Sequence, residues 1–337
     1  MKILITGGAG YIGSHTIIEL LELTDWEVVS IDDYSNSSPE TYNRIKNIAS
    51  VDIPHFDVDL KDRSALRKVF EEHSFDGIIH FAAFKAVGES VDNPLMYYEN
   101  NIGGLVNLLD CQKEFGVRHQ LFSSSCTVYG SSAQSPVTEN EASGNAESPY
   151  GFTKVIGERI LSDFAATGDY NILALRYFNP VGAHMSGQLG ELPIGVPNNL
   201  VPYITQTAAG IREELTIFGG DYDTRDGTCV RDYIHVTDIA RAHILGLKHL
   251  LDNKQVQAFD YINLGTGNGV TVKEAVDAFM EVNKVDLKYK IGPRRAGDIA
   301  AIYADNSKAA EVLGWHPELS LNQMMESAWK WQEYLQA

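Results

Sequence analysis

Residues 2–20, KILITGGAGYIGSHTIIEL, decide the fold. The stretch begins as a short apolar run typical of a buried strand, and residues 14–24 have apolar side chains at helical spacing. Between them Gly7, Gly10 and Gly13 stand three residues apart. Glycines at such a turn let the chain bend tightly and let backbone amides approach a pyrophosphate at the helix N-terminus. The stretch therefore predicts a dinucleotide-binding strand, turn and helix.

An acidic residue follows at the end of the next apolar run. Residues 27–31, EVVSI, are typical of a second strand, and Asp32 comes 19 residues after Gly13. A carboxylate there accepts hydrogen bonds from ribose hydroxyls and repels a 2′-phosphate, so Asp32 favours NAD over NADP.

Strand and helix patterns alternate over the first 180 residues. Near-continuous apolar runs are what parallel strands buried on both faces require. Alternation at this pitch predicts an α/β fold with a Rossmann-type, doubly wound parallel sheet. The further strands are expected at 54–60, 76–82, 119–125 and 171–177, and the further helices at 63–73, near 94–116 and at 150–167.

The regular alternation of strand and helix patterns ends near residue 180. Residues 179–199 are rich in Gly and Pro and have little periodicity, and shorter elements follow. Long loops of this kind are usually functional. We therefore expect a dinucleotide-binding domain at 1–180 and a smaller C-terminal α/β substrate domain at 181–337, and part of 233–265 could return to pack on the first domain.

Composition bounds the function. The 337 residues are 44% hydrophobic and 21% charged, as in a globular protein, and no run approaches the roughly 18 apolar residues of a membrane span. The net charge of −18 excludes a basic nucleic-acid footprint. Any site for an anionic ligand must therefore gather its few cations locally.

Cysteine and histidine spacing argues against a metal site. Cys111, Cys126 and Cys229 are odd in number and widely spaced, and the ten histidines form no metal-spaced cluster. No basic-then-apolar leader opens the sequence. We expect a cytoplasmic protein without disulfides and without a metal.

The stretch ESPYGFTKVIGER (147–159) places Tyr150 four residues before Lys154, at the start of an expected helix. Residues i and i+4 share one face of a helix. Taken alone, the pair also fits a partly exposed dimer or solvent face.

Both motifs together resemble the extended short-chain dehydrogenase/reductase family, in which a Tyr and a Lys four residues apart carry the chemistry. The resemblance implies that Tyr150 takes a proton from a sugar hydroxyl while NAD takes the hydride. We expect Lys154 and the nicotinamide cation to lower the pKa of Tyr150. A hydroxyl at the end of the strand holds the substrate oxygen; Ser125 is our choice, with Ser123 and Ser124 as competitors.

A longer set of motifs is similar to the UDP-glucose 4-epimerase family, from residue 1 to about residue 335. The resemblance implies interconversion of UDP-galactose and UDP-glucose: NAD takes hydride from C4, the 4-keto sugar swings about its diphosphate, and hydride returns to the opposite face. The motifs are TGGAGYIGSHT, FAAFKAVGESV, FSSSCTVYG, SPYGFTK, LRYFNPVGAH, PNNLVPYI, DGTCVRDYIHV, INLGTG and RRAGDIAAIYAD.

Three different functions also stay open. Sugar-nucleotide dehydratases and decarboxylases with this fold carry carboxylates between the serine and the tyrosine, where this sequence has Cys126 and Thr127. Neither residue is a carboxylic acid, which disfavours elimination. The second function is that of a different nucleotide-sugar epimerase, including one acting on UDP-N-acetylhexosamines. The third is that of a non-catalytic NAD-sensing module.

The resemblance also implies the binding residues. Those expected to bind NAD are Gly7, Gly10, Tyr11, Ile12, Gly13, Asp32, Asn36, Asp59, Leu60, Phe81, Ala82, Lys85, Asn100, Tyr150, Lys154 and Phe178. Those expected to bind the UDP-hexose are Ser125, Tyr150, Asn179, Asn199, Leu200, Phe218, Arg231, Arg295, Asp298 and Ile302.

Two features of this set have physical meaning. Lys85, Arg231 and Arg295 supply the cations that an acidic chain needs against phosphates, although Arg231 and Arg295 could also form surface ion pairs. The resemblance implies that bulk at position 302 limits 2-acetamido sugars; Ile302 is intermediate in size, so the choice of sugar stays open. The resemblance further implies a homodimer formed through the helices near 94–116 and at 150–167.

Overall fold

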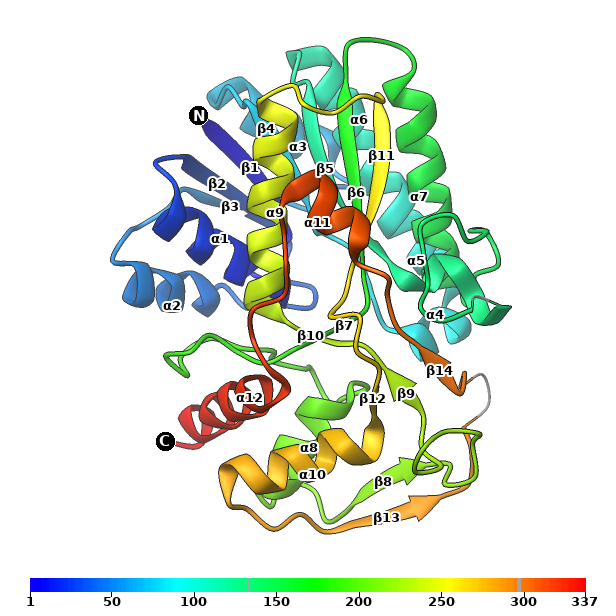
Figure 1. The fold of residues 1–337 in the computed structure, drawn as a ribbon. Coiled ribbons are helices and arrows are strands. Elements are labelled where there is room, and N and C mark those ends of the chain that lie inside the picture. Colours follow the sequence, from blue (N-terminus) through cyan, green and yellow to red (C-terminus); the bar gives the residue numbers. More distant parts are fainter. Residues whose placement is uncertain (133, 296–297) are drawn as a thin grey trace. The chain divides into compact units, whose positions relative to one another are not determined.

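The computed structural model describes residues 1–132, 134–295 and 298–337 (Figure 1). They form two compact units. The first comprises Met1–Gly130, Ala142–Arg176 and Ala240–Ile262, and the second comprises Ser131–Glu141, Tyr177–Ile239 and Asn263–Ala337. The sequence predicted a boundary at residue 180; in the structure three segments of chain build each unit.

A seven-stranded sheet organises the first unit, in the order β11-β6-β5-β4-β1-β2-β3. Its strands are β1 (Lys2–Thr6), β2 (Glu27–Asp32), β3 (His55–Asp57), β4 (Gly77–His80), β5 (His119–Ser125), β6 (Asn171–Tyr177) and β11 (Phe259–Leu264). Strand β1 pairs in parallel with both β2 and β4. The chain first builds outward to β3 and then returns to β4, so the order reverses beside β1. Ligands bind outside the carboxyl ends of the strands at such a point.

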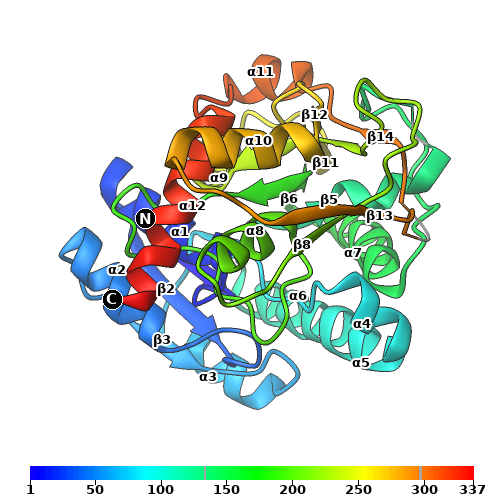
Figure 2. The ribbon, with the colours of Figure 1, turned by 90° about the horizontal axis from the view of Figure 1, so that it is seen from below.

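Helices cover both faces of this sheet. Helix α9 (Val236–Leu251) lies across one face, where Leu247 approaches Gly77 of β4, and α3 and α6 lie on the other (Figure 1). Figure 2 shows the layers from below. The helices of the unit are α1 (Tyr11–Leu23), α2 (Glu40–Ala49), α3 (Arg63–Glu72), α4 (Val87–Asp92), α5 (Pro94–Tyr98), α6 (Gly104–Phe115) and α7 (Pro149–Ala165). The predicted Rossmann-type fold is confirmed.

Apolar packing on both faces explains the apolar strands. Leu4, Ile78 and Leu108 belong to one buried cluster between the sheet, α3 and α6. All four residues of β4 are buried. Helix α3 begins where the side chain of Asp62 accepts hydrogen bonds from the amides of Ser64 and Ala65.

The helical pattern near 94–116 is interrupted. Helix α5 ends at Tyr98, a π-helical turn spans Glu99–Gly103, and α6 begins at Gly104. Buried Asn101 lies in this turn; its side chain donates to the Phe84 carbonyl and to Thr153 Oγ1, both at 3.0 Å. The turn therefore ties α7 to the loop after β4, and π turns of this kind are frequent at functional sites.

The second unit contains three small sheets, ordered β10-β7, β12-β9-β14 and β13-β8. Its strands are β7 (Asn179–Val181), β8 (Leu215–Phe218), β9 (Val230–Arg231), β10 (Tyr233–His235), β12 (Val270–Thr271), β13 (Tyr289–Gly292) and β14 (Ala301–Ile302). The helices are α8 (Leu200–Ala208), α10 (Val272–Asn283), α11 (Ser307–Leu313) and α12 (Leu321–Gln336). Ile204, Phe279 and Met325 lie in its fully buried core.

Within the described ranges, no helix has both the length and the apolar composition that crossing a lipid bilayer requires.

Candidate active site

The glycine turn after β1 is tightly packed. Gly7 has φ +74°, and a Cβ atom there would lie 2.7 Å from the backbone nitrogen of Ala82. A Cβ atom on Gly13 would lie 2.3 Å from the carbonyl oxygen of Gly7. The Gly10 amide donates to that same carbonyl at 3.1 Å. The glycines therefore allow backbone segments to lie closer together than a side chain would permit, as a dinucleotide-binding turn requires.

Helix α1 begins directly behind this turn. Its N-cap residue, Gly10, offers no side-chain cap, and the first turn contains no acidic residue. The first amides of the helix and the positive end of its dipole therefore face the turn without a competing carboxylate. This is the environment that a pyrophosphate prefers.

Asp32 lies at the carboxyl end of β2, beside the glycine turn. Its Oδ2 accepts from the amide of Ala9 at 2.9 Å, and its Oδ1 accepts from Ser37 Oγ at 2.7 Å. Burial raises the pKa of Asp32, and these hydrogen bonds oppose the rise. The carboxylate links the glycine turn to the loop after β2, where the sequence predicts the ribose.

The remaining expected cofactor residues of the first unit lie on the loops around this edge. Asp59 Oδ1 accepts from the amide of Lys61 at 2.8 Å, and buried Leu60 packs against Gly104 of α6. Asn100 lies in the π-helical turn and donates to Asn101 at 3.1 Å. Asn36 is exposed in the loop after β2.

The loop after β4 contacts the start of α1. The amide of Ala82 donates to the Thr6 carbonyl at 3.1 Å, so this loop follows the end of β1. Lys85 Nζ lies 5.8 Å from the centre of the Tyr11 ring. A cation is thereby placed close to the glycine turn, as an anionic cofactor would need. Phe81 and Ile12 are half-buried in the same region.

Helix α7 begins at a well-defined cap that sets the position of Tyr150. Ser148 Oγ accepts from the amide of Gly151 at 3.1 Å, and Pro149 occupies the first helical position. Tyr150 is therefore in the first turn and Lys154 in the next.

The catalytic candidates meet the end of β5. Lys154 Nζ donates to the carbonyl oxygen of Ser123 at 2.7 Å and lies 5.9 Å from the centre of the Tyr150 ring. The Tyr150 hydroxyl is hydrogen-bonded to the side chain of Ser125. The structure thus brings the three predicted catalytic residues, Ser125, Tyr150 and Lys154, together.

Ser125 has the geometry that its competitors lack. The Ser124 hydroxyl donates to Glu158 at 2.5 Å, away from Tyr150. Ser123 meets Lys154 through its backbone carbonyl. Of the three serines at the strand end, Ser125 is the one whose side chain is bonded to the phenol.

Burial shifts both titratable groups toward their neutral forms. It raises the pKa of Tyr150 to about 12, although the hydrogen bond with Ser125 opposes the rise. It lowers the pKa of Lys154 to about 8, although the charge of Glu158 opposes the fall. The pKa of Tyr150 is therefore shifted opposite to our expectation from the sequence. A lowered pKa requires a further positive charge, such as that of an oxidised nicotinamide.

Sequence reasoning missed a buried ion pair behind these residues. Arg176 on β6 and Glu158 on α7 form a bidentate pair with side chains 1% and 8% exposed. One signal was available: an arginine interrupts the apolar strand NILALRY, and a charged residue in such a place is almost always paired.

A second cluster lies in the second unit. Asp298 Oδ1 accepts from Arg295 at 2.8 Å and from Arg231 at 3.3 Å. Arg231 also donates to the carbonyl of Ile299 at 2.7 Å. Two cations thus share one carboxylate, which leaves a net positive charge. Of the motif RRAGDIAAIYAD, residues 296 and 297 lie outside the described residues.

Two apolar candidates adjoin the cluster. The Arg295 guanidinium lies 5.8 Å from the centre of the Phe218 ring. Ile302, on β14, is paired with Arg231 on β9 and is 8% exposed. The structure therefore brings together Phe218, Arg231, Arg295, Asp298 and Ile302.

The other expected substrate residues are placed by different contacts. Asn179 opens β7, and its amide donates to the Asp232 carbonyl at 3.0 Å. Asn199 donates to Glu191 at 2.8 Å, and Leu200 packs against the core of the unit. Phe178, expected near the nicotinamide, is buried, and its amide donates to the Leu264 carbonyl at 3.2 Å.

The positions that hold carboxylates in dehydratases lie at the start of a 3-10 segment, Cys126–Ser132, that is kinked at Gly130. The Thr127 amide donates to Ser125 Oγ at 3.2 Å. The three cysteines are free, and the described residues contain no group of three or more His, Cys, Asp or Glu side chains that could hold a metal ion.

Comparisons with known proteins agree with this geometry. The family model described as GDP-mannose 4,6 dehydratase matches residues 4–328. The UDP-glucose 4-epimerase of Bacillus subtilis (strain 168) is 48% identical over 333 residues, covering 98% of this chain and 97% of that protein.

Two solved structures are similar over nearly the whole chain. UDP-glucose 4-epimerase from Stenotrophomonas maltophila, with bound NAD and formylated UDP-arabinopyranose, is 46% identical with a TM-score of 0.96, covering 100% of this chain and 99% of that one. UDP-glucose 4-epimerase from Bifidobacterium longum, in complex with NAD+ and UDP, is 44% identical with a TM-score of 0.93. The similarity covers 99% of this chain and 98% of that one. The chain therefore belongs to the UDP-glucose 4-epimerase family, within the extended short-chain dehydrogenase/reductases.

Proposed function

We infer that this protein is an NAD-dependent UDP-glucose 4-epimerase that interconverts UDP-galactose and UDP-glucose. One observation carries the proposal: the Tyr150 hydroxyl is bonded to Ser125 while Lys154 is anchored one turn away on the Ser123 carbonyl. A phenol, a hydroxyl donor and an ammonium in this arrangement suit reversible oxidation of a secondary alcohol. The family relationship supplies the nucleotide sugar.

The glycine turn fits NAD. A Cβ atom on Gly13 would overlap the backbone of Gly7, so the turn has the close approach that a pyrophosphate cradle needs. The amides at the start of α1 would hold the pyrophosphate, and Asp32 the adenosine ribose. Relatives solved with NAD support this assignment.

Tyr150 is the group that moves a proton. Bound NAD supplies a reversible acceptor for the hydride of C4. Tyr150, as phenolate, takes the proton of the C4 hydroxyl while the C–H electron pair leaves as hydride, so the alcohol becomes a ketone. Ser125 donates to the same oxygen and holds it beside the phenol. When hydride returns to the opposite face of the ketone, Tyr150 gives the proton back, so no net oxidant is required.

Lys154 fixes the electrostatics of this exchange. Its ammonium favours the phenolate form of Tyr150 by charge, and its anchor on the Ser123 carbonyl holds it at the strand end. Because Lys154 is only 4% exposed, water screens this charge weakly.

We assign the UDP diphosphate to Arg231 and Arg295 in the second unit. Both guanidinium groups donate to the same carboxylate oxygen of Asp298, which keeps them close together. The planar guanidinium group suits hydrogen bonding to phosphate oxygens. Phe218 would contact the uracil. Within this proposal residues 1–180 form the NAD-binding domain, which also supplies Ser125 and Tyr150 to the sugar, and residues 181–337 form the nucleotide-sugar-binding domain.

We also propose a cytoplasmic homodimer. In the first unit, α4, α5 and α7 expose large apolar side chains: Val91 is 60% exposed, Leu95 80% and Phe152 40%. These helices are packed against one another. An exposed apolar surface of this kind is typical of an interface with a second subunit.

The competing functions differ in their products. A dehydratase would release a 4-keto-6-deoxy sugar, but Cys126 and Thr127 offer no carboxylic acid for expelling water. The buried Ile302 leaves acceptance of UDP-N-acetylhexosamines as a second candidate activity. A non-catalytic sensor would not need Ser125, Tyr150 and Lys154 in contact.

The deciding experiment incubates the purified protein with UDP-galactose, without added NAD, and follows UDP-glucose with a coupled dehydrogenase. Turnover by the wild type and its loss in Tyr150→Phe supports the proposal. Absence of turnover with and without added NAD would refute it. Parallel incubation with UDP-N-acetylgalactosamine tests the second candidate activity.

A further inference from the structure

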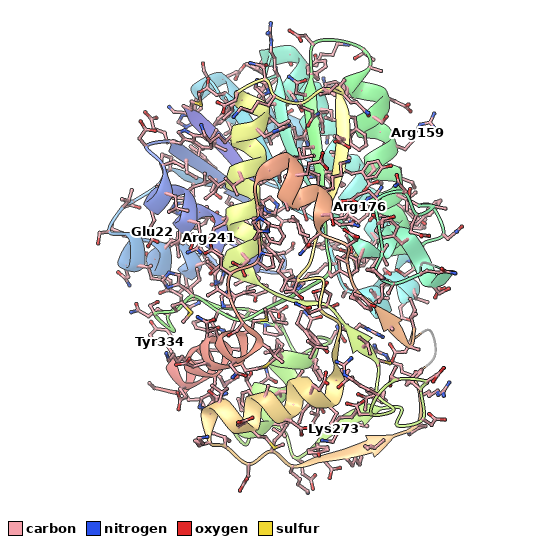
Figure 3. The ribbon with its side chains drawn as sticks, in the orientation of Figure 1. Glu22, Arg159, Arg176, Arg241, Lys273 and Tyr334 are labelled. Atoms are coloured by element: carbon pink, nitrogen blue, oxygen red, sulfur yellow. The ribbon has the colours of Figure 1, made fainter. Side chains whose placement is uncertain are left out.

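The buried pair Glu158–Arg176 lies behind the catalytic residues, and both side chains make several hydrogen bonds. Arg176 Nε donates to Glu158 Oε1 at 2.8 Å, and Nη1 donates to the Tyr129 hydroxyl at 2.9 Å. The guanidinium also lies 3.7 Å from the centre of the Tyr261 ring. Figure 3 marks Arg176 inside the first unit and Arg159 on the outer side of α7.

The same glutamate holds the strand end that carries the catalytic contacts. Ser124 Oγ donates to Glu158 Oε1 at 2.5 Å. Ser124 stands in the chain between Ser123, whose carbonyl anchors Lys154, and Ser125, which is bonded to Tyr150. A shift of Ser124 would therefore displace both contacts at once.

Helix geometry places Glu158 in line with the catalytic pair. Tyr150, Lys154 and Glu158 follow one another at intervals of four residues along α7, so they share one face. The carboxylate thus faces the ammonium from the turn beyond it.

Fold stability alone does not require an ion pair here. Burying two charges carries a desolvation penalty, and apolar residues of similar volume often serve a core as well or better. The pair is also more elaborate than core filling needs, because it engages a strand end, a tyrosine hydroxyl and an aromatic ring.

We propose that Glu158 and Arg176 are positioning residues for proton transfer: Glu158 fixes Ser124, and through it the Ser123 carbonyl and the Ser125 hydroxyl, and its charge keeps Lys154 protonated. Arg176 is the counterion that holds Glu158 in place. This inference rests on the proposed function of Ser125, Tyr150 and Lys154.

Among the described residues, few charged or titratable groups lie around Lys154. Tyr150 and Glu158 face it from α7, and His80 faces it from β4. Burial lowers the pKa of His80 to about 3, so this ring adds no charge near neutrality. Arg176 on β6 acts through Glu158. Within the part of the chain that the structure describes, Glu158 is therefore the side chain that supplies a negative charge beside the Lys154 ammonium near neutral pH.

Glu158→Gln removes the anion and leaves Arg176 without its counterion. Both changes lower the pKa of Lys154, so the alkaline limb of the kcat profile moves to lower pH, by about one unit. We expect kcat at neutral pH to fall about tenfold or more, because small displacements of a catalytic group have effects of this size. KM for UDP-galactose stays within about twofold, since the contacts proposed above for the nucleotide, Phe218, Arg231 and Arg295, lie elsewhere.

Two matched variants separate positioning from folding. Asp163→Asn removes one carboxylate from the same helix, where Asp163 pairs with exposed Arg159, and should leave kcat and the pH profile unchanged. In the double variant Glu158→Gln/Arg176→Met both buried charges are gone, so the alkaline limb returns toward its wild-type position. If the pair only stabilised the fold, the alkaline limb would not shift in Glu158→Gln and return in the double variant.

Ser124→Ala tests the positioning without changing any charge, and it decides the question if Glu158→Gln fails to fold. We expect kcat about threefold to tenfold lower, an unshifted pH limb, and a melting temperature close to that of the wild type. Wild-type kcat in Ser124→Ala, or an unshifted limb in folded Glu158→Gln, would overturn the inference. A wild type that epimerises no UDP-galactose would instead refute the proposed function.

Discussion

The ammonium of Lys154 donates a 2.7 Å hydrogen bond to the carbonyl oxygen of Ser123 while it lies 5.9 Å from the centre of the Tyr150 ring. A single buried cation thus joins the end of β5 to the first two turns of α7. This position carries an electrostatic cost, because burial disfavours the protonated form of Lys154.

Burial of the charged Lys154 side chain should therefore lower the stability of the folded protein, although activity requires this residue. Its pKa in the folded protein, about 8, lies below the ordinary 10.5, which corresponds to roughly 3 kcal/mol against folding at neutral pH. The hydrogen bond to Ser123 offsets part of this, at about 1–2 kcal/mol. We expect Lys154→Met to abolish turnover and to raise the melting temperature at pH 7 by a few degrees.

The pH dependence of this effect has a definite sign. The cost is fully present below pH 8, where both states are protonated, and disappears as the pH rises through 10.5, where both are neutral. Calorimetry at pH 7 and pH 10 should therefore show the advantage of Lys154→Met shrinking. An advantage that grows with pH would contradict the assignment.

The oxidised cofactor should lower the pKa of Tyr150. Burial is the main cause that raises that pKa to about 12, so a phenolate near neutrality needs the nicotinamide charge. Ultraviolet difference titration of the NAD-loaded protein should show one tyrosine ionising well below pH 10, and it should be missing in Tyr150→Phe. After the cofactor is reduced, and the positive charge lost, this ionisation should move back to higher pH. An ionisation insensitive to the redox state would exclude this mechanism.

Gly13→Ala should abolish retention of NAD. The new methyl group would lie 2.3 Å from the Gly7 carbonyl oxygen, which neither backbone segment can accommodate without moving. Protein-bound NAD, measured after denaturation, should fall at least tenfold. Gly103→Ala is the matched control, because a Cβ atom there meets nothing within 4 Å. Equal NAD content in both variants would show that the turn is not the pyrophosphate site.

Arg231→Gln should weaken binding of the nucleotide. A charged hydrogen bond contributes about 1.5–3 kcal/mol, so we expect the Kd for UDP to rise about 10-fold to 100-fold. Turnover at saturating UDP-galactose should change little, since Arg231 lies outside the proton-transfer group. Arg225→Gln, which removes an exposed arginine paired with Glu274 in the same unit, should leave the Kd unchanged. Equal effects of both variants in titration calorimetry would argue against the diphosphate assignment.

Local sequence was sufficient for six of the seven strands of the central sheet; β11 was not predicted as a strand. The predicted strands 2–6, 119–125 and 171–177 coincide with β1, β5 and β6. Strands β1 and β6 are mainly apolar, whereas β5, HQLFSSS, is buried although most of its residues are polar. Helix α2, Glu40–Ala49, was not predicted: its buried side chains are Thr41, Tyr42 and Ile45, too few for a clear apolar stripe.

What the sequence could not supply depends on tertiary contacts. Spacing places Tyr150 and Lys154 on one helical face, but the choice of Ser125 over Ser124 required the contact between Ser124 and Glu158. The direction of the Tyr150 pKa shift required its burial. Arg176 finds Glu158 from a different element, 18 residues away in the chain, which no local pattern encodes.

Isotope retention tests the central claim most directly. UDP-galactose carrying deuterium at C4 is converted to UDP-glucose without added NAD, and the product is examined by mass spectrometry and NMR. If Tyr150 moves only the hydroxyl proton while hydride leaves and returns within one active site, deuterium stays at C4 of every product molecule. Loss of the deuterium to solvent, or its transfer to another carbon, would contradict the mechanism.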